Sequence, residues 1–198
     1  MCKVAVVTNR HLCREDFLVR IERLAAGGAD RIILREKDMT ADAYEQLAEK
    51  VLHICERYHT ECILHTFTEV CRRLSHPYIH LPLSVMQSIK REAMWQTVGA
   101  SVHSTEEARQ AQSWGVDYIT AGHIFETDCK RGVAGRGTAF IKEVCDAAHI
   151  PVWAIGGISA ETIGKLDSIG IEGVCIMSSA MKTKNPTKMI GLLKGSVV

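Results

Sequence analysis

Residues 98–121 read VGASVHSTEEARQAQSWGVDYITA, and this stretch decides the fold class. Two short apolar runs, 98–102 and 118–121, flank a polar segment with helical periodicity. Ser104 is a typical helix N-cap, and Glu107, three residues later, completes the pattern of a capping box. A glycine then ends the segment before the second apolar run, as is common at helix C-termini. The stretch therefore predicts a strand–helix–strand unit with parallel strands.

The same alternation of apolar runs and amphipathic segments extends over the whole chain. Strands are predicted at 4–8, 31–34, 62–65, 78–81, 98–102, 118–121, 152–155 and 173–177. Helices are predicted between them at 16–28, 41–58, 104–115, 140–148 and 159–170. Most of the strand runs are continuously apolar, which is typical of strands that are covered on both faces.

Eight predicted strands favour an α/β fold with a single (β/α)8 TIM barrel of parallel strands over residues 1–198. The other parallel architecture, a doubly wound sheet, usually has about five or six strands and carries GxGxxG after the first when it binds dinucleotides. Here the first strand is followed by NRHLCRED, residues 9–16, which contains no glycine. We therefore expect a single-domain barrel.

Composition makes several partner classes improbable. The chain has 198 residues, 46% hydrophobic and 24% charged, with a formal net charge of +1. Neither nucleic acid nor an anionic membrane surface is expected as a partner at this charge. No apolar run approaches the ~20 residues that span a bilayer, and the N-terminal run is shorter than the ~7–15 apolar residues of a signal peptide. The simplest expectation is a cytoplasmic protein.

The cysteines are expected to be buried apolar residues or inert thiols. They stand at positions 2, 13, 55, 62, 71, 129, 145 and 175, with no CxxC pair. Without a secretion signal, such scattered cysteines do not predict disulfides or a zinc site. Cys129 alone deserves consideration as a reactive thiol, because Lys130 and Arg131 follow it directly.

In a TIM barrel the active site lies at the carboxyl ends of the strands. Four histidines fall at such ends: His65, His80, His103 and His123. The sequence has no HExxH motif, so no metal and no cofactor are predicted. A strand-end histidine can abstract a proton near neutral pH. His123 is the candidate general base, because it opens the polar loop GHIFETDCKRGVAGRG (122–137). Which of the loop charges contact substrate stays open: Glu126, Asp128, Lys130, Arg131 and Arg136.

The ends of the last two predicted strands suggest a phosphate site. The candidates are Gly156, Gly157, Ser178 and Ser179. Glycines let backbone approach a ligand, free N–H groups at a helical turn attract anions, and barrels often bind phosphate at these loops. A tight turn and an ordinary cap are the alternative explanation. Arg35 begins the run REKD. The run is either a solvated charged turn, or it directs the Arg35 guanidinium toward the barrel mouth, where it can bind a carboxylate or phosphate with two hydrogen bonds.

Nearly the whole chain resembles the thiamine phosphate synthase superfamily. The resemblance rests on LREKD (34–38), SVHSTEEARQAQSWGVDYITAGHIFETDCKRGVAGRG (101–137), VWAIGGIS (152–159) and GVCIMSSA (173–180). The superfamily implies two possible activities. The synthase joins a pyrimidine pyrophosphate to a thiazole phosphate with Mg²⁺. The thiazole tautomerase (TenI-like) branch, an isomerase, aromatises a dihydrothiazole carboxylate phosphate without a metal.

Two departures from the synthase pattern favour the tautomerase branch. The synthase has Asn-Asp after the third strand and an HxGQxD-like run after the fourth, and their aspartates hold Mg²⁺. This sequence has His65-Thr66 and HLPLSV (80–85) there, so Val85 replaces an acidic ligand. The synthase also has Gly-Pro where this chain has Gly122-His123, and GHIFETDCK is similar to the tautomerase motif.

The resemblance then implies roles for individual residues. His123 would take a proton from the dihydrothiazole ring, and His103 would orient the substrate or tune His123. Arg35, Lys37 and Ser101 would bind the substrate, a small phosphorylated thiazole, while the glycine and serine positions above would hold its phosphate. A homodimer is expected from the superfamily alone. Two alternatives stay open: a divergent synthase that recruits Mg²⁺ with other residues, and a non-catalytic ligand-binding regulator of thiamine metabolism.

Overall fold

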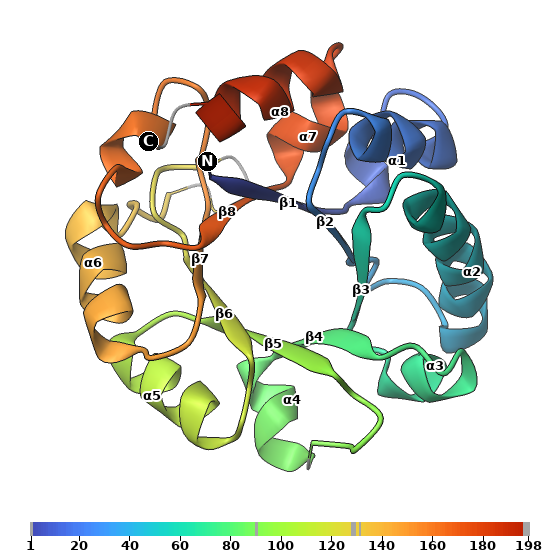
Figure 1. Ribbon diagram of the computed structural model, residues 1–198, viewed down its shortest axis with the longest axis horizontal. Helices are drawn as coiled ribbons and strands as arrows, with labels where there is room; N and C mark the ends of the chain where they lie inside the picture. The colour runs from blue at the N-terminus through green and yellow to red at the C-terminus, as the bar shows by residue number, and fades with distance from the viewer. Residues whose placement is uncertain (1, 90, 128–129, 131, 196–198) are drawn as a thin grey trace.

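Eight parallel strands close into a barrel in the order in which they occur along the chain, as Figure 1 shows. The computed structural model describes residues 2–89, 91–127, 130 and 132–195. The strands are β1 (Lys3–Val7), β2 (Arg31–Leu34), β3 (Glu61–His65), β4 (Tyr78–Pro82), β5 (Thr97–Val102), β6 (Tyr118–Gly122), β7 (Val152–Ile155) and β8 (Gly173–Ile176). Since β8 pairs with β1, the sheet has no free edge. The predicted (β/α)8 barrel is confirmed, and each predicted strand lies within one residue of its observed bounds.

Helices surround the barrel (Figure 1). They are α1 (Phe17–Ala26), α2 (Ala41–Arg57), α3 (Thr68–Arg73), α4 (Leu83–Ser88), α5 (Thr105–Ser113), α6 (Gly137–Ala147), α7 (Ser178–Lys182) and α8 (Pro186–Gly195), with 3-10 turns at Arg10–Leu12 and Ile163–Leu166. The predicted helices at 16–28, 41–58, 104–115 and 140–148 correspond to α1, α2, α5 and α6. None of the helices among the described residues is long and apolar enough to cross a bilayer.

The predicted helix at 159–170 is wrong, because only a 3-10 turn forms there. The Thr162 hydroxyl accepts a hydrogen bond from the Ser159 N–H at 2.9 Å and donates to the Gly157 carbonyl at 3.0 Å. These side-chain bonds hold the backbone in a local turn. Ser168 (φ 61°) and Gly170 (φ 88°) then take left-handed conformations, which end any helical path.

The capping box of α5 differs by one residue from its prediction. The Ser104 hydroxyl accepts from the Glu107 N–H at 3.0 Å, as expected of an N-cap. The Glu107 carboxylate, however, accepts from the backbone N–H of His103 at 2.5 Å, whereas the capping box predicts the N–H of Ser104. The helix start therefore also fixes the backbone of His103, which lies at the carboxyl end of β5.

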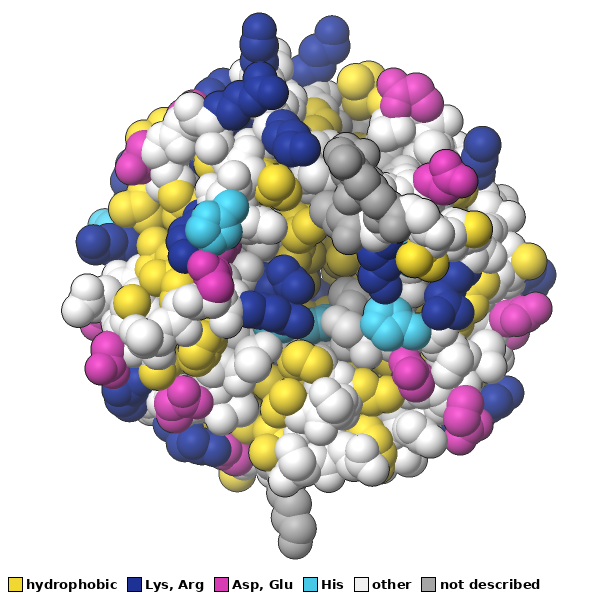
Figure 2. All heavy atoms as spheres, turned by 180° about the vertical axis from the view of Figure 1, so that it is seen from behind, with side chains coloured by type: hydrophobic (Ala, Val, Ile, Leu, Met, Phe, Trp, Pro, Cys, Tyr) yellow, Lys and Arg dark blue, Asp and Glu magenta, His cyan; other side chains and the backbone are white. Residues whose placement is uncertain are grey.

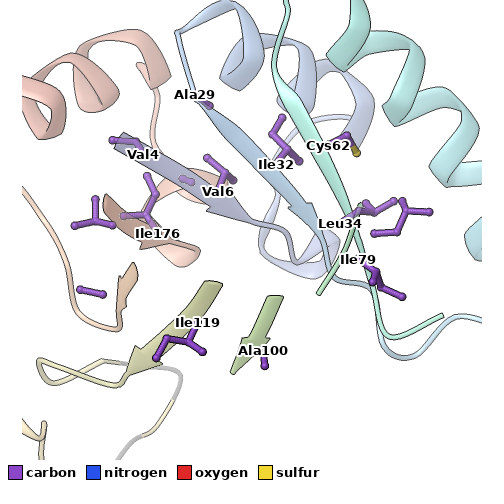
Figure 3. Close-up of a cluster of buried hydrophobic side chains, with 14 of the residues drawn as sticks. Val4, Val6, Ala29, Ile32, Leu34, Cys62, Ile79, Ala100, Ile119 and Ile176 are labelled. Carbon is purple, nitrogen blue, oxygen red and sulfur yellow. The ribbon is translucent and has the colours of Figure 1, made fainter. Parts of the chain in front are cut away.

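The main core lies between the barrel wall and the helices. Figure 3 shows part of it, including Val4 and Val6 of β1, Ile32 and Leu34 of β2, and Ile119 of β6. These are alternate residues of their strands, so the residues between them face the barrel interior. Burial on both faces explains why the strands are continuously apolar in sequence.

The amino-terminal half of the barrel interior is filled by two aromatic side chains. Tyr118 is 2% exposed and Trp153 is 1% exposed, and their rings meet edge to face at 6.5 Å. The Arg31 guanidinium lies over both rings, 4.9 Å from the centroid of Tyr118 and 4.7 Å from that of Trp153. Glycines make this possible: a Cβ at Gly99 would lie 2.2 Å from the Tyr118 ring, and one at Gly173 2.7 Å from Trp153. We call these five residues the barrel floor.

The described cysteines are free thiols, as predicted. Five of them are buried: Cys2, Cys55, Cys62, Cys71 and Cys175. Burial raises the pKa of Cys71 and of Cys175 to about 12, so the reactive thiolate is disfavoured in both. Cys129, the candidate reactive thiol, lies outside the described residues.

Candidate active site

A cavity of about 900 Å³ opens at the carboxyl ends of the strands, above the barrel floor. Figure 2 shows one face of the molecule hollowed at its centre, with lysine and arginine side chains gathered around the hollow. The structure brings all nine predicted site residues to the wall of this one cavity: Arg35, Lys37, Ser101, His103, His123, Gly156, Gly157, Ser178 and Ser179. Their roles stay predictions, since position alone assigns no chemistry.

In the REKD turn after β2, the two basic side chains line the cavity and the two acidic side chains bind Arg10. Arg35 and Lys37 line the cavity. The Glu36 carboxylate is buried and accepts hydrogen bonds from the backbone N–H and the guanidinium of Arg10, each at 3.1 Å. Asp38 accepts two further bonds from the same guanidinium at 2.6 Å, which lower the pKa of its carboxyl. Because Arg10 satisfies both acidic side chains, the two cations remain available to an anionic ligand.

His65 and His80 stand side by side in the cavity wall, with ring centroids 5.4 Å apart. Burial lowers the pKa of His80 to about 3, with the positive charges of Arg35 and Arg31 as further causes. Burial also lowers the pKa of His65 well below its ordinary value, assisted by the neighbouring His80 and Arg35. Both imidazoles are therefore neutral at physiological pH and act as hydrogen-bonding groups rather than as cations.

His103 presents a free ring nitrogen at the edge of the cavity. Its Nδ1 lies 2.9 Å from the carbonyl oxygen of Gly122, and a carbonyl can only accept, so Nδ1 carries the proton. In the neutral ring Nε2 is then an acceptor. The side chain is exposed and lines the cavity. His103 is thus placed to accept a proton or a hydrogen bond from a ligand.

His123, the predicted general base, is buried and has one of its ring nitrogens in a hydrogen bond. The residue is 5% exposed, and its Nε2 lies 3.2 Å from the carbonyl oxygen of Val133. This bond leaves Nδ1 as the acceptor, and Nδ1 is buried without a hydrogen-bond partner among the described residues. His123 lines the cavity as a residue, but its Nδ1 is buried from solvent in this structure.

Gly156 and Gly157 are required by the neighbouring loop of the protein. A Cβ at Gly156 would lie 2.3 Å from the Cβ of His123, and one at Gly157 would lie 2.4 Å from the carbonyl oxygen of Glu126. Both have positive φ, 102° and 67°, which L-residues with side chains rarely adopt. These contacts explain the glycine pair without a ligand, so the pair alone is weaker support for a phosphate site than the sequence suggested.

The loop after β6 contributes charges of both signs to the cavity. Glu126 and Lys130 line it, whereas Arg136 instead lies over the Phe140 ring at 5.1 Å. The remaining loop charges, Asp128 and Arg131, lie outside the described residues.

The residues around the cavity do not fit a Mg²⁺ ion held by carboxylates. The strand ends where the synthase pattern has its acidic ligands supply His65, Thr66 and Val85. Of the described carboxylates in the cavity wall, Glu107 is engaged by the His103 backbone, which leaves Glu126. No group of three or more His, Cys, Asp and Glu residues in the described part of the chain is arranged to hold a metal. Mg²⁺ prefers carboxylate and phosphate oxygens, so this donor set is poor.

Sequence reasoning missed Tyr118 and Thr120 as part of the site. Thr120 lines the cavity, and Tyr118 contacts the cavity residue His80 through its hydroxyl at 3.0 Å. The signal was present in the alternation of β6, because residues 118, 120 and 122 all face the barrel interior. Tyr118 and Thr120 were read only as part of the strand run YITA, because neither interrupts its strand pattern.

Comparison with known proteins identifies the family. The family model described as thiamine monophosphate synthase matches residues 4–180. The chain belongs to this family. Thiamine-phosphate synthase of Fusobacterium nucleatum is 32% identical over 193 residues, covering 96% of this chain and 94% of that protein. Thiamine-phosphate synthase of Methanobrevibacter smithii is 31% identical over 184 residues, covering 91% and 88%. A solved structure, thiamine phosphate pyrophosphorylase from Pyrococcus furiosus, superposes with a TM-score of 0.84 at 25% identity over 98% of this chain and 94% of that one.

These relatives confirm the predicted superfamily and overturn the predicted activity. The expected activity, that of a thiazole tautomerase, is wrong: curated relatives at about 30% identity over almost their full length are named synthases. The choice of branch rested on a few positions at the ends of three strands and on one loop motif. Such local differences change a site without changing the barrel or the overall similarity.

Proposed function

We propose that this protein is an enzyme of thiamine biosynthesis and acts as a thiamine-phosphate synthase. In that reaction a pyrimidine pyrophosphate is joined to a thiazole phosphate, and pyrophosphate is released. The proposal is supported by the family match over residues 4–180 and by the names of the full-length relatives. A synthase site has to accommodate two phosphorylated molecules at once.

The observation that carries the proposal is the single cavity with two groups of anion-attracting residues. Its volume of about 900 Å³ lies near the upper end of ordinary ligand pockets, which hold about 300–1,000 Å³. Arg35 and Lys37 stand after β2, and Ser178 and Ser179 stand after β8. Burial and the charge of Arg35 lower the pKa of Lys37, so this ammonium gains from an anion beside it.

The predicted residues then take roles in the synthase reaction. Arg35 and Lys37 bind the pyrophosphate and stabilise the charge that it gains on leaving. The backbone of Gly157, Ser178 and Ser179 receives the phosphate of the thiazole. These cations do in this site what a carboxylate-bound metal does elsewhere, namely balance phosphate charge.

A direct assay tests the proposal. Purified protein is given a thiazole phosphate and a pyrimidine pyrophosphate, with Mg²⁺ or with a chelator, and thiamine phosphate is measured. We expect product, and we expect Lys37→Met to lower kcat/KM by about tenfold or more, whereas Lys142→Met should not change it. Lys142 is the matched control, because it is exposed and pairs with Asp146 on α6. Absence of thiamine phosphate under both conditions would contradict the proposal.

The side chains available for a metal favour a second candidate function, that of a non-catalytic regulator that binds the same ligands. The observation is that the ends of β3 and β4 supply no carboxylate for a metal. A binding protein of this kind would bind thiazole phosphate or thiamine phosphate in the cavity, measured by calorimetry, and would yield no product in the assay above.

A further inference from the structure

A chain of hydrogen bonds connects the barrel floor with the cavity. The Tyr118 hydroxyl lies 3.0 Å from His80 Nδ1, and His80 Nε2 lies 2.8 Å from the Ser101 hydroxyl. The Thr120 hydroxyl donates to the same Ser101 oxygen at 3.2 Å. Tyr118 and His80 are each 2% exposed and Thr120 is 3% exposed, and His80, Ser101 and Thr120 line the cavity. The four side chains come from three adjacent strands, β4, β5 and β6.

The direction of each hydrogen bond in this chain can be worked out from the partners. His80 Nδ1 is the hydrogen-bond partner of the Tyr118 hydroxyl among the described residues. Burial raises the pKa of Tyr118 well above its ordinary value, so the phenol keeps its proton. If Nδ1 donated, that buried phenol proton would have no acceptor, which is unfavourable. Tyr118 therefore donates, and Nδ1 accepts.

The tautomer of His80 follows from this direction and fixes the next bond. A neutral imidazole that accepts at Nδ1 carries its proton on Nε2. Nε2–H then donates to Ser101, whose oxygen also accepts from Thr120. With both acceptor positions of Ser101 occupied, its own proton has to point elsewhere. No described residue accepts from Ser101, and the open direction is the cavity.

The surrounding packing holds the chain in place. Tyr118 reaches His80 because Gly99 has no side chain: a Cβ there would lie 2.5 Å from the Tyr118 hydroxyl. Arg31 and Trp153 enclose the ring of Tyr118 from the floor side. On the other side the His80 ring stacks on His65, whose Nδ1 lies 2.6 Å from the Thr66 hydroxyl. Rotation of Tyr118 or His80 would therefore disturb several buried neighbours.

We propose that Tyr118 and His80 are positioning residues that hold the Ser101 hydroxyl as a hydrogen-bond donor to an acceptor atom on the ring of the bound ligand. Ser101 discriminates between ligands, because a ring atom with a lone pair satisfies the donor and a C–H or N–H leaves it unpaired. Only the choice of ligand rests on the proposed function. The orientation of the chain is a property of the protein without ligand.

Nitrogen NMR of isotope-labelled histidine tests the orientation directly. In the wild type His80 should show a protonated Nε2 and a bare Nδ1. Tyr118→Phe removes the donor to Nδ1, and both tautomers should then be populated. A proton on Nδ1 in the wild type, or an unchanged Nε2–H tautomer in Tyr118→Phe, would overturn the proposal. The melting temperature shows whether Tyr118→Phe is folded, and the wild-type spectrum decides the tautomer even if it is not.

Ligand binding tests the role of Ser101. The probes are a pyrimidine pyrophosphate and pyrophosphate itself, which has the same anion but no ring. Ser101→Ala should weaken binding of the first by about tenfold and leave binding of the second unchanged, since one hydrogen bond to the ring is lost. Ser113→Ala, on the exposed face of α5, is the matched control. Equal losses for both probes, or no loss for either, would contradict the proposal.

A double variant separates positioning from simple destabilisation. Tyr118→Phe should weaken binding of the pyrimidine pyrophosphate less than Ser101→Ala does. The double variant should bind it as well as Ser101→Ala alone. Additive losses would mean that Tyr118 does not act through Ser101. If the wild type binds no pyrimidine pyrophosphate at all, the proposed function and the ligand assignment fail together, and the NMR result still decides the orientation of the chain.

Discussion

The barrel floor and the barrel mouth are built from the same strands and serve opposite purposes. At the floor, Tyr118, Trp153 and Arg31 fill the interior, and glycines at 99 and 173 make room for them. At the mouth, inward positions two to four residues further along carry Ser101, Thr120 and Arg35, which line a cavity. The change from packed to open occurs within a few residues of each strand. Inward position alone therefore does not identify a functional residue, because only inward residues near the carboxyl end of a strand line the cavity.

This contrast predicts where substitutions cost stability and where they cost binding. Floor residues do not line the cavity, so their loss should lower the free energy of unfolding, and Tyr118 should in addition affect binding through His80 and Ser101. Mouth residues make fewer internal contacts, and their loss should change ligand affinity at nearly constant stability. His80 lies between the two regions and should affect both.

The largest effect is expected at the floor. Trp153→Ala removes a side chain that is 1% exposed, and it should lower the free energy of unfolding by about 3–5 kcal/mol, measured by urea denaturation. Trp114→Ala is the control, because Trp114 lies half-buried at the end of α5 and should cost less. A loss at Trp153 no larger than that at Trp114 would break the distinction between floor and surface.

At the boundary, His80 should make stability depend on pH. Its pKa is about 3 in the folded protein and 6.5 ordinarily, so the unfolded chain binds a proton that the folded chain refuses. Stability is therefore lost as pH falls from about 6.5 toward 3, by about 2 kcal/mol from this residue at about pH 5. His80→Gln should lose less stability than the wild type between about pH 7 and pH 5, measured by denaturation at each pH. Equal losses in both proteins would exclude His80 as the cause.

At the mouth, Arg35→Met should change affinity rather than stability. We expect binding of pyrophosphate, measured by calorimetry, to weaken by about tenfold, because a charge-assisted hydrogen-bond donor is removed. The melting temperature should stay close to that of the wild type. Arg109→Met on the exposed side of α5 is the control and should leave binding unchanged. A large fall in melting temperature with unchanged affinity would place Arg35 in the structural scaffold.

The fold could be predicted from the sequence because burial on both faces marks every strand. The runs RIIL and VWAI coincide with β2 and β7 to the residue. The segment 159–170 misled the prediction, since its helical periodicity competes with the turn that Thr162 closes through its side chain. Whether a helix or the turn forms depends on the position of the Gly157 carbonyl, and hydrophobic periodicity carries no information on that position.

The site could be predicted as a set of residues but not as a network. Position at a strand end was sufficient to bring Arg35, His103 and Ser179 to one cavity. The sequence did not show that Glu36 and Asp38 bind Arg10 while Arg35 and Lys37 line the cavity, because Arg10 lies 28 residues before Asp38. Likewise, the contact of Tyr118 with His80 depends on the stagger between strands and on the missing side chain of Gly99. The activity was assigned wrongly because a few substituted positions were weighted above the similarity of the whole chain.

The stoichiometry of the reaction at the mouth distinguishes a synthase from a binding protein. Thiamine phosphate and pyrophosphate are quantified together after incubation of the protein with both substrates, for the wild type and for Arg35→Met. We expect equal amounts of the two products from the wild type and a rate lower by about tenfold in the variant. Binding of both substrates with neither product formed would contradict it and would leave a ligand-binding protein in place of a synthase.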